Sequence, residues 1–470
     1  MHARAPCLYD EAMRSLLLSF VLLAACGDDG ANRLPDAPPP DPDAAVDAAP
    51  DTPVTVTIRM RGVPVEDVDV YFQNPDQSVA AVVPTDANGV ARAVVTPGGS
   101  VTAVRPFPLI DGVSSKELRT WLGVQPGDQL LLEAPFGPAA SEATVTFNAP
   151  VDPEASSYLL YVGCYGFPVS MTGVNGSGGT PTYTMSVQNC ATTDVLVDAT
   201  HFDGTTHTYI YQPNVALTDG ATIELTGTYA TVPATTWTWT NLPAGVNELD
   251  FESRLVTPGG VMSELYASSI ETLSGGATFT SPRPTIPGAL SVTETILRDP
   301  DAQRTRHGIY DWGTTTFDLA GALLPDFTAP ATFTASTRSV AWESSGGTAP
   351  DGVLLDLRVY QTAFKSSFRW HVLAPAGTTV ALPAVPAALT DFAFAADDDA
   401  EINNLATIKV PGGYAALRSY GQSLDPYFAA PVVATTAAGR AQFAIYEVRD
   451  FVRKRQPRAW QRPSVTSVAP

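Results

Sequence analysis

Most of the chain alternates between apolar and polar residues with a period of two, the pattern of β-strands that bury one face. The first such segment is Val54–Met60, in which Val54, Val56 and Ile58 alternate with polar residues. Similar segments recur to about residue 448, and short runs of Gly, Pro, Asp and Asn, which favour turns, separate them. The pattern therefore predicts an all-β chain.

One segment fits two patterns. Ser114–Glu117 has the form of a capping box, and Leu118, Trp121 and Leu122 would share one face of a helix that ends at Gly123. The same residues also alternate as in a strand. We expect a strand here, because the neighbouring segments are strands.

Composition agrees with a chain of several β-domains. Hydrophobic residues make up 44% of the 470 residues and charged residues only 16%, with 36 Gly and 41 Pro. A chain of this length is expected to fold into about three to four domains. We place a sandwich at 53–136, a disulfide-containing sandwich at 137–229, a β-rich domain at 230–326 and a sandwich at 327–452.

Near the N-terminus the alternation gives way to an unbroken run of apolar and small residues, Leu16–Cys26. The run is too short to span a bilayer as a helix, which takes about 20 apolar residues, and it has the length of a secretory signal. Asp10 and Glu11 lie where a basic segment is expected. We therefore expect translation to start at Met13, with a long N-terminal segment before the apolar run as the alternative.

The run ends in Leu23-Ala24-Ala25-Cys26, which resembles the lipobox of bacterial lipoproteins. The resemblance implies that residues 1–25 are a signal peptide and that Cys26 carries the lipid. In lipoprotein sorting, an Asp after the lipidated Cys favours the inner membrane in some bacteria, and here Gly27 follows it. The implied location is the outer membrane, on its periplasmic or its outer side, with the membrane as a partner through the lipid.

The distribution of charge indicates how the two ends of the chain behave and argues against one class of partner. Residues 26–52 are rich in Asp, Ala and Pro, which predicts an extended, solvated linker. The net charge is −21, so an acidic body would repel nucleic acid, and no nucleic-acid partner is expected. The tail at 453–470 is basic and interrupted by Pro, and we expect it to be flexible.

Three segments of the first unit carry a family resemblance. Gly62–Val65, Val68–Phe72 and Thr85–Ala91 together resemble the bacterial immunoglobulin-like repeats of surface adhesins and the carboxypeptidase regulatory-like domain. The resemblance covers about 80 residues and implies an immunoglobulin-like β-sandwich of about seven strands. Neither family has catalytic residues in this domain, so none are implied here.

Two of the four cysteines are left for a disulfide. Cys7 precedes the apolar run and is lost on processing, and Cys26 is the lipid site, which leaves Cys164 and Cys190. In an oxidising envelope this pair is predicted to form a structural disulfide, with two separate buried thiols as the alternative.

The densest acidic run is a candidate calcium site. Its carboxylates belong to Asp397, Asp398, Asp399 and Glu401, and calcium prefers oxygen ligands of this kind. A solvated acidic turn is the favoured interpretation.

A second metal candidate is the pair His201 and His207, with Asp203 between them. Gly204–Thr206 reads as a hairpin turn, so we favour two polar residues at strand ends. We therefore expect no metal and no cofactor.

Aromatic residues suggest one kind of binding site. Trp237 and Trp239 alternate on one segment, and these side chains or Trp370 could stack on a sugar, although such residues more often form the core face of a strand. The Gly-x-Ser-x-Gly, His-Glu-x-x-His and P-loop motifs are missing, so we expect no catalytic residues.

The leading hypothesis is a non-catalytic binding or structural protein of the cell envelope, with a surface polysaccharide or protein as its partner. The first alternative is a carbohydrate-binding or adhesion module. The second is a hydrolase without a recognisable motif, with β-sandwich accessory domains.

Overall fold

The chain is described here by a computed structural model. It describes residues 51–446 except for the segments 61–62, 105–115, 135–141, 164–167, 172–178, 189, 245, 247, 258–259, 272–274, 299–304, 322, 362–365, 396–397 and 420–439.

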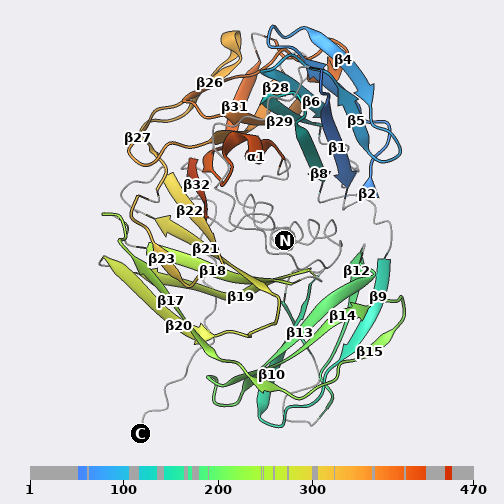
Figure 1. The fold of residues 1–470 in the computed structure, drawn as a ribbon, viewed down its shortest axis with the longest axis vertical. Coiled ribbons are helices and arrows are strands. Elements are labelled where there is room, and N and C mark those ends of the chain that lie inside the picture. The colour runs from blue at the N-terminus through green and yellow to red at the C-terminus, as the bar shows by residue number, and fades with distance from the viewer. Residues whose placement is uncertain are drawn as a thin grey trace, which may run out of the picture.

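The largest sheet of the described residues has twelve strands, and Figure 1 shows them from β18 and β19 at the lower left to β4 at the upper right. In spatial order its strands are β19 (Gly260–Glu271), β18 (Glu248–Thr257), β21 (Leu290–Arg298), β22 (Thr305–Trp312), β32 (Arg440–Tyr446), β31 (Asp399–Lys409), β28 (Gly352–Gln361), β29 (Ser366–Pro375), β7 (Lys116–Val124), β6 (Gly99–Val104), β3 (Asp69–Gln73) and β4 (Val79–Pro84). Within this sheet, the neighbouring strands β29 and β7 run parallel to each other. The sheet therefore contains strands from the expected units 53–136, 230–326 and 327–452.

Four smaller sheets complete these parts of the molecule. One contains β1 (Val54–Met60), β2 (Val63–Pro64), β5 (Val90–Ala93) and β8 (Gln129–Ala134). The others contain β17 (Ala234–Thr240), β20 (Gly276–Pro282) and β23 (Thr316–Asp318); β24 (Asp326–Phe327) and β27 (Ser344–Ser345); and β25 (Thr332–Thr334), β26 (Ser339–Ala341) and β30 (Thr379–Ala381). The described helices are α1 (Gly413–Ser419) and two 3-10 turns, Ala335–Thr337 and Thr390–Phe392.

The unit 137–229 builds a sandwich of its own, in green at the lower right of Figure 1. One layer contains β10 (Ala155–Val162), β11 (Pro168–Ser170), β13 (Thr192–His201) and β14 (His207–Ala216), together with β16 (Ala230–Thr231), which lies just beyond residue 229. The other contains β9 (Glu142–Asn148), β12 (Thr182–Gln188) and β15 (Thr222–Glu224). Its core residues all lie between 145 and 225.

The period-two pattern of the first strand is confirmed by its packing. Val54, Val56 and Ile58 are fully buried and pack in one core with Trp121 of β7. The same core contains Leu373 of β29, so it continues beyond the first sandwich. Burial of this kind stabilises each layer against the other, by up to about 3 kcal/mol for one fully buried large aliphatic side chain.

The fold class predicted from the sequence, all-β with sandwiches, is confirmed. The ambiguous segment is the strand β7 and not a helix. Its partners β6 and β29 flank it on both sides, so its backbone hydrogen bonds are made within the sheet. Among the described residues, no helix has both the length and the apolar character needed to cross a bilayer.

Candidate functional site

Several of the residues predicted from sequence lie outside the described residues: Cys26, Cys164 and Asp397. Cys190 is disulfide-bonded. Because Cys164 is outside the described residues, the Cys164–Cys190 pairing stays a prediction.

The three tryptophans proposed for sugar stacking lie in the core. Trp237 and Trp239 point inward from β17 and are 0% and 1% exposed. The Trp239 ring stacks on Phe317 at a centroid distance of 5.2 Å. Trp370 is 1% exposed, and its indole N–H donates to the Thr120 hydroxyl at 2.9 Å. Buried rings present no face to a ligand, so the sugar-stacking interpretation is corrected to core packing.

The described members of the acidic run, Asp398, Asp399 and Glu401, each have a different hydrogen-bond partner. Asp398 accepts the backbone N–H of Ala395 at 2.7 Å and so closes a turn. Asp399 accepts the next backbone N–H, and Glu401 accepts the Tyr360 hydroxyl at 2.8 Å. The described residues include no group of three or more His, Cys, Asp or Glu side chains placed to hold a metal.

The second metal candidate forms the predicted hairpin turn. β13 ends at His201 and β14 begins at His207. Between them, Asp203 accepts the backbone N–H groups of Thr205 and Thr206, both at 2.8 Å, and the Thr206 hydroxyl at 2.6 Å. These hydrogen bonds lower the pKa of Asp203, so its carboxylate fixes the turn in its ionised form.

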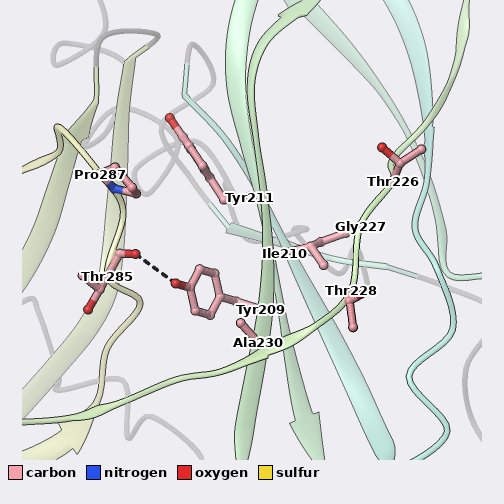
Figure 2. A pocket seen from close by; sticks show the side chains of 9 residues that line it. All are labelled: Tyr209, Ile210, Tyr211, Thr226, Gly227, Thr228, Ala230, Thr285 and Pro287. Carbon is pink, nitrogen blue, oxygen red and sulfur yellow. Dashed lines mark hydrogen bonds between the residues drawn. The ribbon is translucent and has the colours of Figure 1, made fainter.

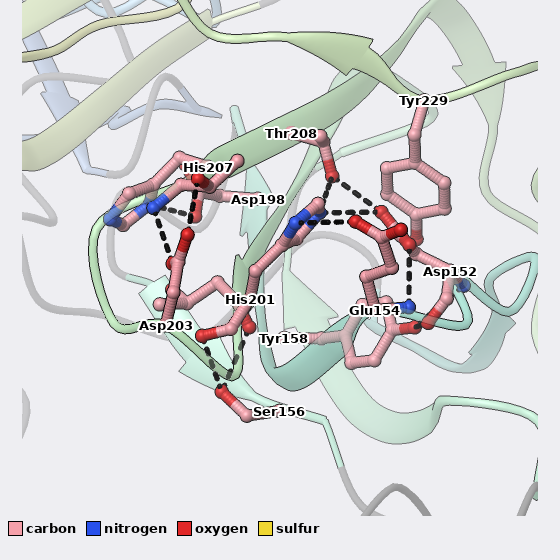
Figure 3. Close-up of polar contacts among 12 residues, drawn as sticks. Asp152, Glu154, Ser156, Tyr158, Asp198, His201, Asp203, His207, Thr208 and Tyr229 are labelled. Carbon is pink, nitrogen blue, oxygen red and sulfur yellow. Dashed lines mark hydrogen bonds and ion pairs between the residues drawn. The ribbon is translucent and has the colours of Figure 1, made fainter.

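Figure 3 shows that His201 faces a carboxylate from the segment before β10. Its Nε2 lies 3.1 Å from Asp152 Oδ2, and its Nδ1 lies 3.4 Å from Glu154 Oε2. The Thr208 hydroxyl donates to the same Asp152 oxygen at 2.7 Å. Burial acts to raise the pKa of Asp152, but the hydrogen bonds from Thr208, the Glu154 N–H and His201 hold it below its ordinary value.

This trio has the residue types of a nucleophile, a base and an acid, but its geometry serves structure. A nucleophilic hydroxyl should donate to the imidazole, whereas Thr208 donates to Asp152 and lies 3.4 Å from His201 Nε2. All three residues are buried. The trio therefore joins the hairpin to the segment before β10.

The other histidine of the hairpin is paired separately. His207 Nδ1 lies 3.0 Å from Asp198 Oδ1 on β13. This hydrogen bond raises the pKa of His207 above its ordinary value. The pair links two adjacent strands near the turn, as Figure 3 shows.

A buried charged network in the twelve-stranded sheet was missed by sequence reasoning. Arg119 contacts Glu117 on β7, and His371 Nε2 lies 3.3 Å from Glu117 Oε1 and 3.5 Å from Asp356 Oδ1. All four side chains are buried. The signal was present, because these residues alternate in step with buried apolar ones such as Trp121.

Burial decides the charge of the histidine in this network. Burial first, and then Arg119, lowers the pKa of His371 to about 4, although Glu117 and Asp356 oppose the shift. His371 is therefore neutral near pH 7. With every member buried between strands, the network has the character of a core interaction.

The cavities of the described residues include two shallow ones. The first, shown in Figure 2, has a volume of about 210 Å³ and is lined by β14, the 226–230 segment, Thr285 and Pro287. The second has a volume of about 200 Å³ and lies among residues of 241–243, 319–323 and Gly347. Neither is lined by an Asp, Glu, His, Cys, Lys or Arg side chain.

No family of known proteins and no curated protein matches this chain. Among solved structures, the Bacillus anthracis TIE protein is similar at 10% identity and a TM-score of 0.16, over 57% of this chain and 49% of that protein. The chain thus spans about half of the TIE protein.

Two pilins are similar at the same level. The minor pilin GBS52 of Streptococcus agalactiae has 13% identity and a TM-score of 0.14, over 39% of this chain and 97% of the pilin. The major pilin subunit BcpA of Bacillus cereus has 10% identity and a TM-score of 0.14, over 52% and 87%. These matches specify no function for this chain.

Proposed function

We propose that this chain is a lipid-anchored protein of the bacterial outer membrane that displays its β-sheets and works by binding, without catalysis. The observation that carries the proposal is where the titratable groups lie. The clusters with catalytic residue types around His201 and around His371 are built on buried side chains. The two cavities have no acidic, basic or thiol side chains in their walls.

An enzyme would need an acid, a base or a nucleophile within reach of a bound substrate. The cavities offer tyrosine and threonine hydroxyls, main-chain groups and apolar surface, which are suited to recognition. A flexible acidic linker between the lipid and the β-body would raise the effective concentration of a weak binder near the cell surface. Its partner would be a surface polysaccharide or protein.

The anchoring part of the proposal is tested by the Cys26→Ala variant. We expect the wild-type chain in the membrane fraction after a high-salt wash, labelled by radioactive palmitate, because each buried CH₂ of a lipid contributes about 0.8 kcal/mol. Cys26→Ala should be unlabelled, and either unprocessed or soluble. Asp43→Ala, in the linker that remains after cleavage, is the control and should behave as wild type. A mature Cys26→Ala protein that stays in the membrane fraction would contradict the proposal.

The non-catalytic part is tested with chromogenic glycoside, ester and phosphate substrates. We expect no turnover by the purified chain above a buffer blank. Any turnover is then compared with that of His201→Ala and Glu117→Gln. One of these variants could abolish turnover while its far-ultraviolet circular dichroism stays that of the wild type. That result would favour the hydrolase hypothesis over the proposed function.

A further inference from the structure

The cavity in Figure 2 lies at a junction between two packed parts of the molecule. β14 belongs to the sandwich 137–229, whereas Thr285 and Pro287 follow β20. The two parts pack through an apolar cluster that contains Leu196, Leu255 and Ile286, with Tyr209 and Tyr211 against it. Such junctions are common places for small-molecule sites.

Two tyrosine side chains of this cavity are held in place by their hydroxyls. Tyr209 donates to the Thr285 carbonyl at 2.9 Å, and Tyr211 donates to Asp194 at 2.7 Å. Burial raises the pKa of Tyr211, so it stays a neutral phenol. Figure 2 shows both side chains leaving β14 toward the segment of Thr285 and Pro287. Rings fixed before binding lose little entropy when a ligand stacks on them.

The opposite wall is formed where the chain separates from β14. The last β14–β16 pair is Tyr209 with Ala230. Further along β14, the Thr226 backbone N–H donates to the Gln212 side chain at 3.2 Å. Between these two points lies Gly227, where an added Cβ would touch only the Ile210 side chain, at 3.9 Å.

The stretch of β14 without a strand partner, which we call the opening, is short, and its length limits which ligand can fit. Only two residues of β14, Ile210 and Tyr211, lie between the closed ends, which corresponds to roughly 10 Å of strand. A peptide that adds to a sheet edge usually pairs over about five residues, so the opening is too short for one. The cavity of about 210 Å³ is below the roughly 300–1,000 Å³ of sites for drug-sized ligands.

We propose that this cavity binds one pyranose ring of a neutral polysaccharide, with the Tyr209 and Tyr211 rings against the sugar and the Thr226 and Thr228 hydroxyls toward its polar groups. The uncharged lining favours a neutral sugar. This inference rests on the proposed binding function and names its site and ligand class. One ring in a cavity of this size is expected to bind with a Kd on the order of 1 mM.

The experiment uses the full-length chain in detergent and three probes, cellopentaose, maltopentaose and chitotetraose, with binding measured by saturation-transfer NMR and calorimetry. At least one probe should bind the wild type. Thr228→Trp should block the cavity and weaken binding about tenfold or more, as should Tyr209→Ala. Tyr209→Phe keeps the ring and should bind within about threefold of wild type.

The matched control is Thr222→Trp, which places the same side chain on an exposed strand position of the same sandwich, away from the cavity. It should bind as wild type. Equal binding by Thr228→Trp and wild type, or no binding of any probe, would overturn the inference. Binding of the neutral peptide Thr-Val-Thr-Val-Thr instead, lost in Thr228→Trp, would assign the cavity to strand addition and also overturn it. If no probe binds but membrane anchoring still depends on Cys26, the sugar site is wrong and the proposed function is not contradicted.

Discussion

The His371 imidazole lies close to two carboxylates and still has a pKa of about 4, because burial opposes its charged form. The ordinary pKa is 6.5. Between these values the unfolded chain binds a proton that the folded chain does not. The contribution of His371 to stability is therefore complete above pH 6.5 and is lost as pH falls towards 4, by about 3 kcal/mol at most.

We predict that His371→Gln lowers the sensitivity of folding to acid. Gln cannot take up the proton, so the urea midpoint of the variant should fall less than that of wild type between pH 7 and pH 4.5. His207→Gln is the control of opposite sign, because the pKa of His207 is raised and its protonated form contributes stability at low pH. Its midpoint should fall more than that of wild type. Equal falls in all three proteins would contradict the assignment.

Residue roles that depend on neighbours close in sequence were predictable. Asp203 was expected in a turn, and its bonds to residues two and three positions later make that turn. The hydrogen-bond partner of Trp370 was not predictable, because Thr120 is 250 positions away. The contact between Glu117 and His371 was not predictable for the same reason, although Glu117 alternates with buried residues along its strand.

At the scale of elements, alternation identified strands and failed to identify their partners. Val54–Met60 was predicted and is β1. β7 remained ambiguous, since Leu118, Trp121 and Leu122 also fit a helical face. In the fold, its parallel pairing with β29 makes this segment a strand. Neither strand carries a local sequence signal for that pairing.

The cavity shows the same limit for a candidate site. Aromatic residues suggested the tryptophans of β17, yet the rings beside a cavity are the tyrosines of β14. Both strands place aromatic residues at alternate positions. What differs is that β17 lies between β20 and β23, with its aromatic face against Phe251 and Phe317, whereas β14 loses its partner β16 after Tyr209.

At the scale of the molecule, the twelve-stranded sheet joins segments that sequence analysis assigned to separate units. Composition and turn residues locate the segments 53–136, 230–326 and 327–452, but a linker between units and a loop within one sheet have the same composition. One core contains Phe72 of β3, Leu373 of β29 and Val292 of β21. Segment 137–229 differs, because its core is built from its own residues.

This arrangement predicts that the twelve-stranded sheet loses its protection against hydrogen exchange as one unit. Leu373→Ala removes a fully buried side chain from the shared core and should cost about 2–5 kcal/mol. We expect faster hydrogen exchange, measured by mass spectrometry, in peptides of β3 and β6 and of β18 and β21, as well as in β29 itself.

The matched control is Leu160→Ala, the same substitution at a fully buried position in the core of 137–229. It should speed exchange in β9 and β13 and leave β3 and β6 at wild-type rates, since its core contains no residue of those strands. If Leu373→Ala speeds exchange only in β28, β29 and β31, the parts of the sheet open independently. The four segments would then behave as separate domains despite the continuous pairing, because the energy of each would reside in its own sandwich.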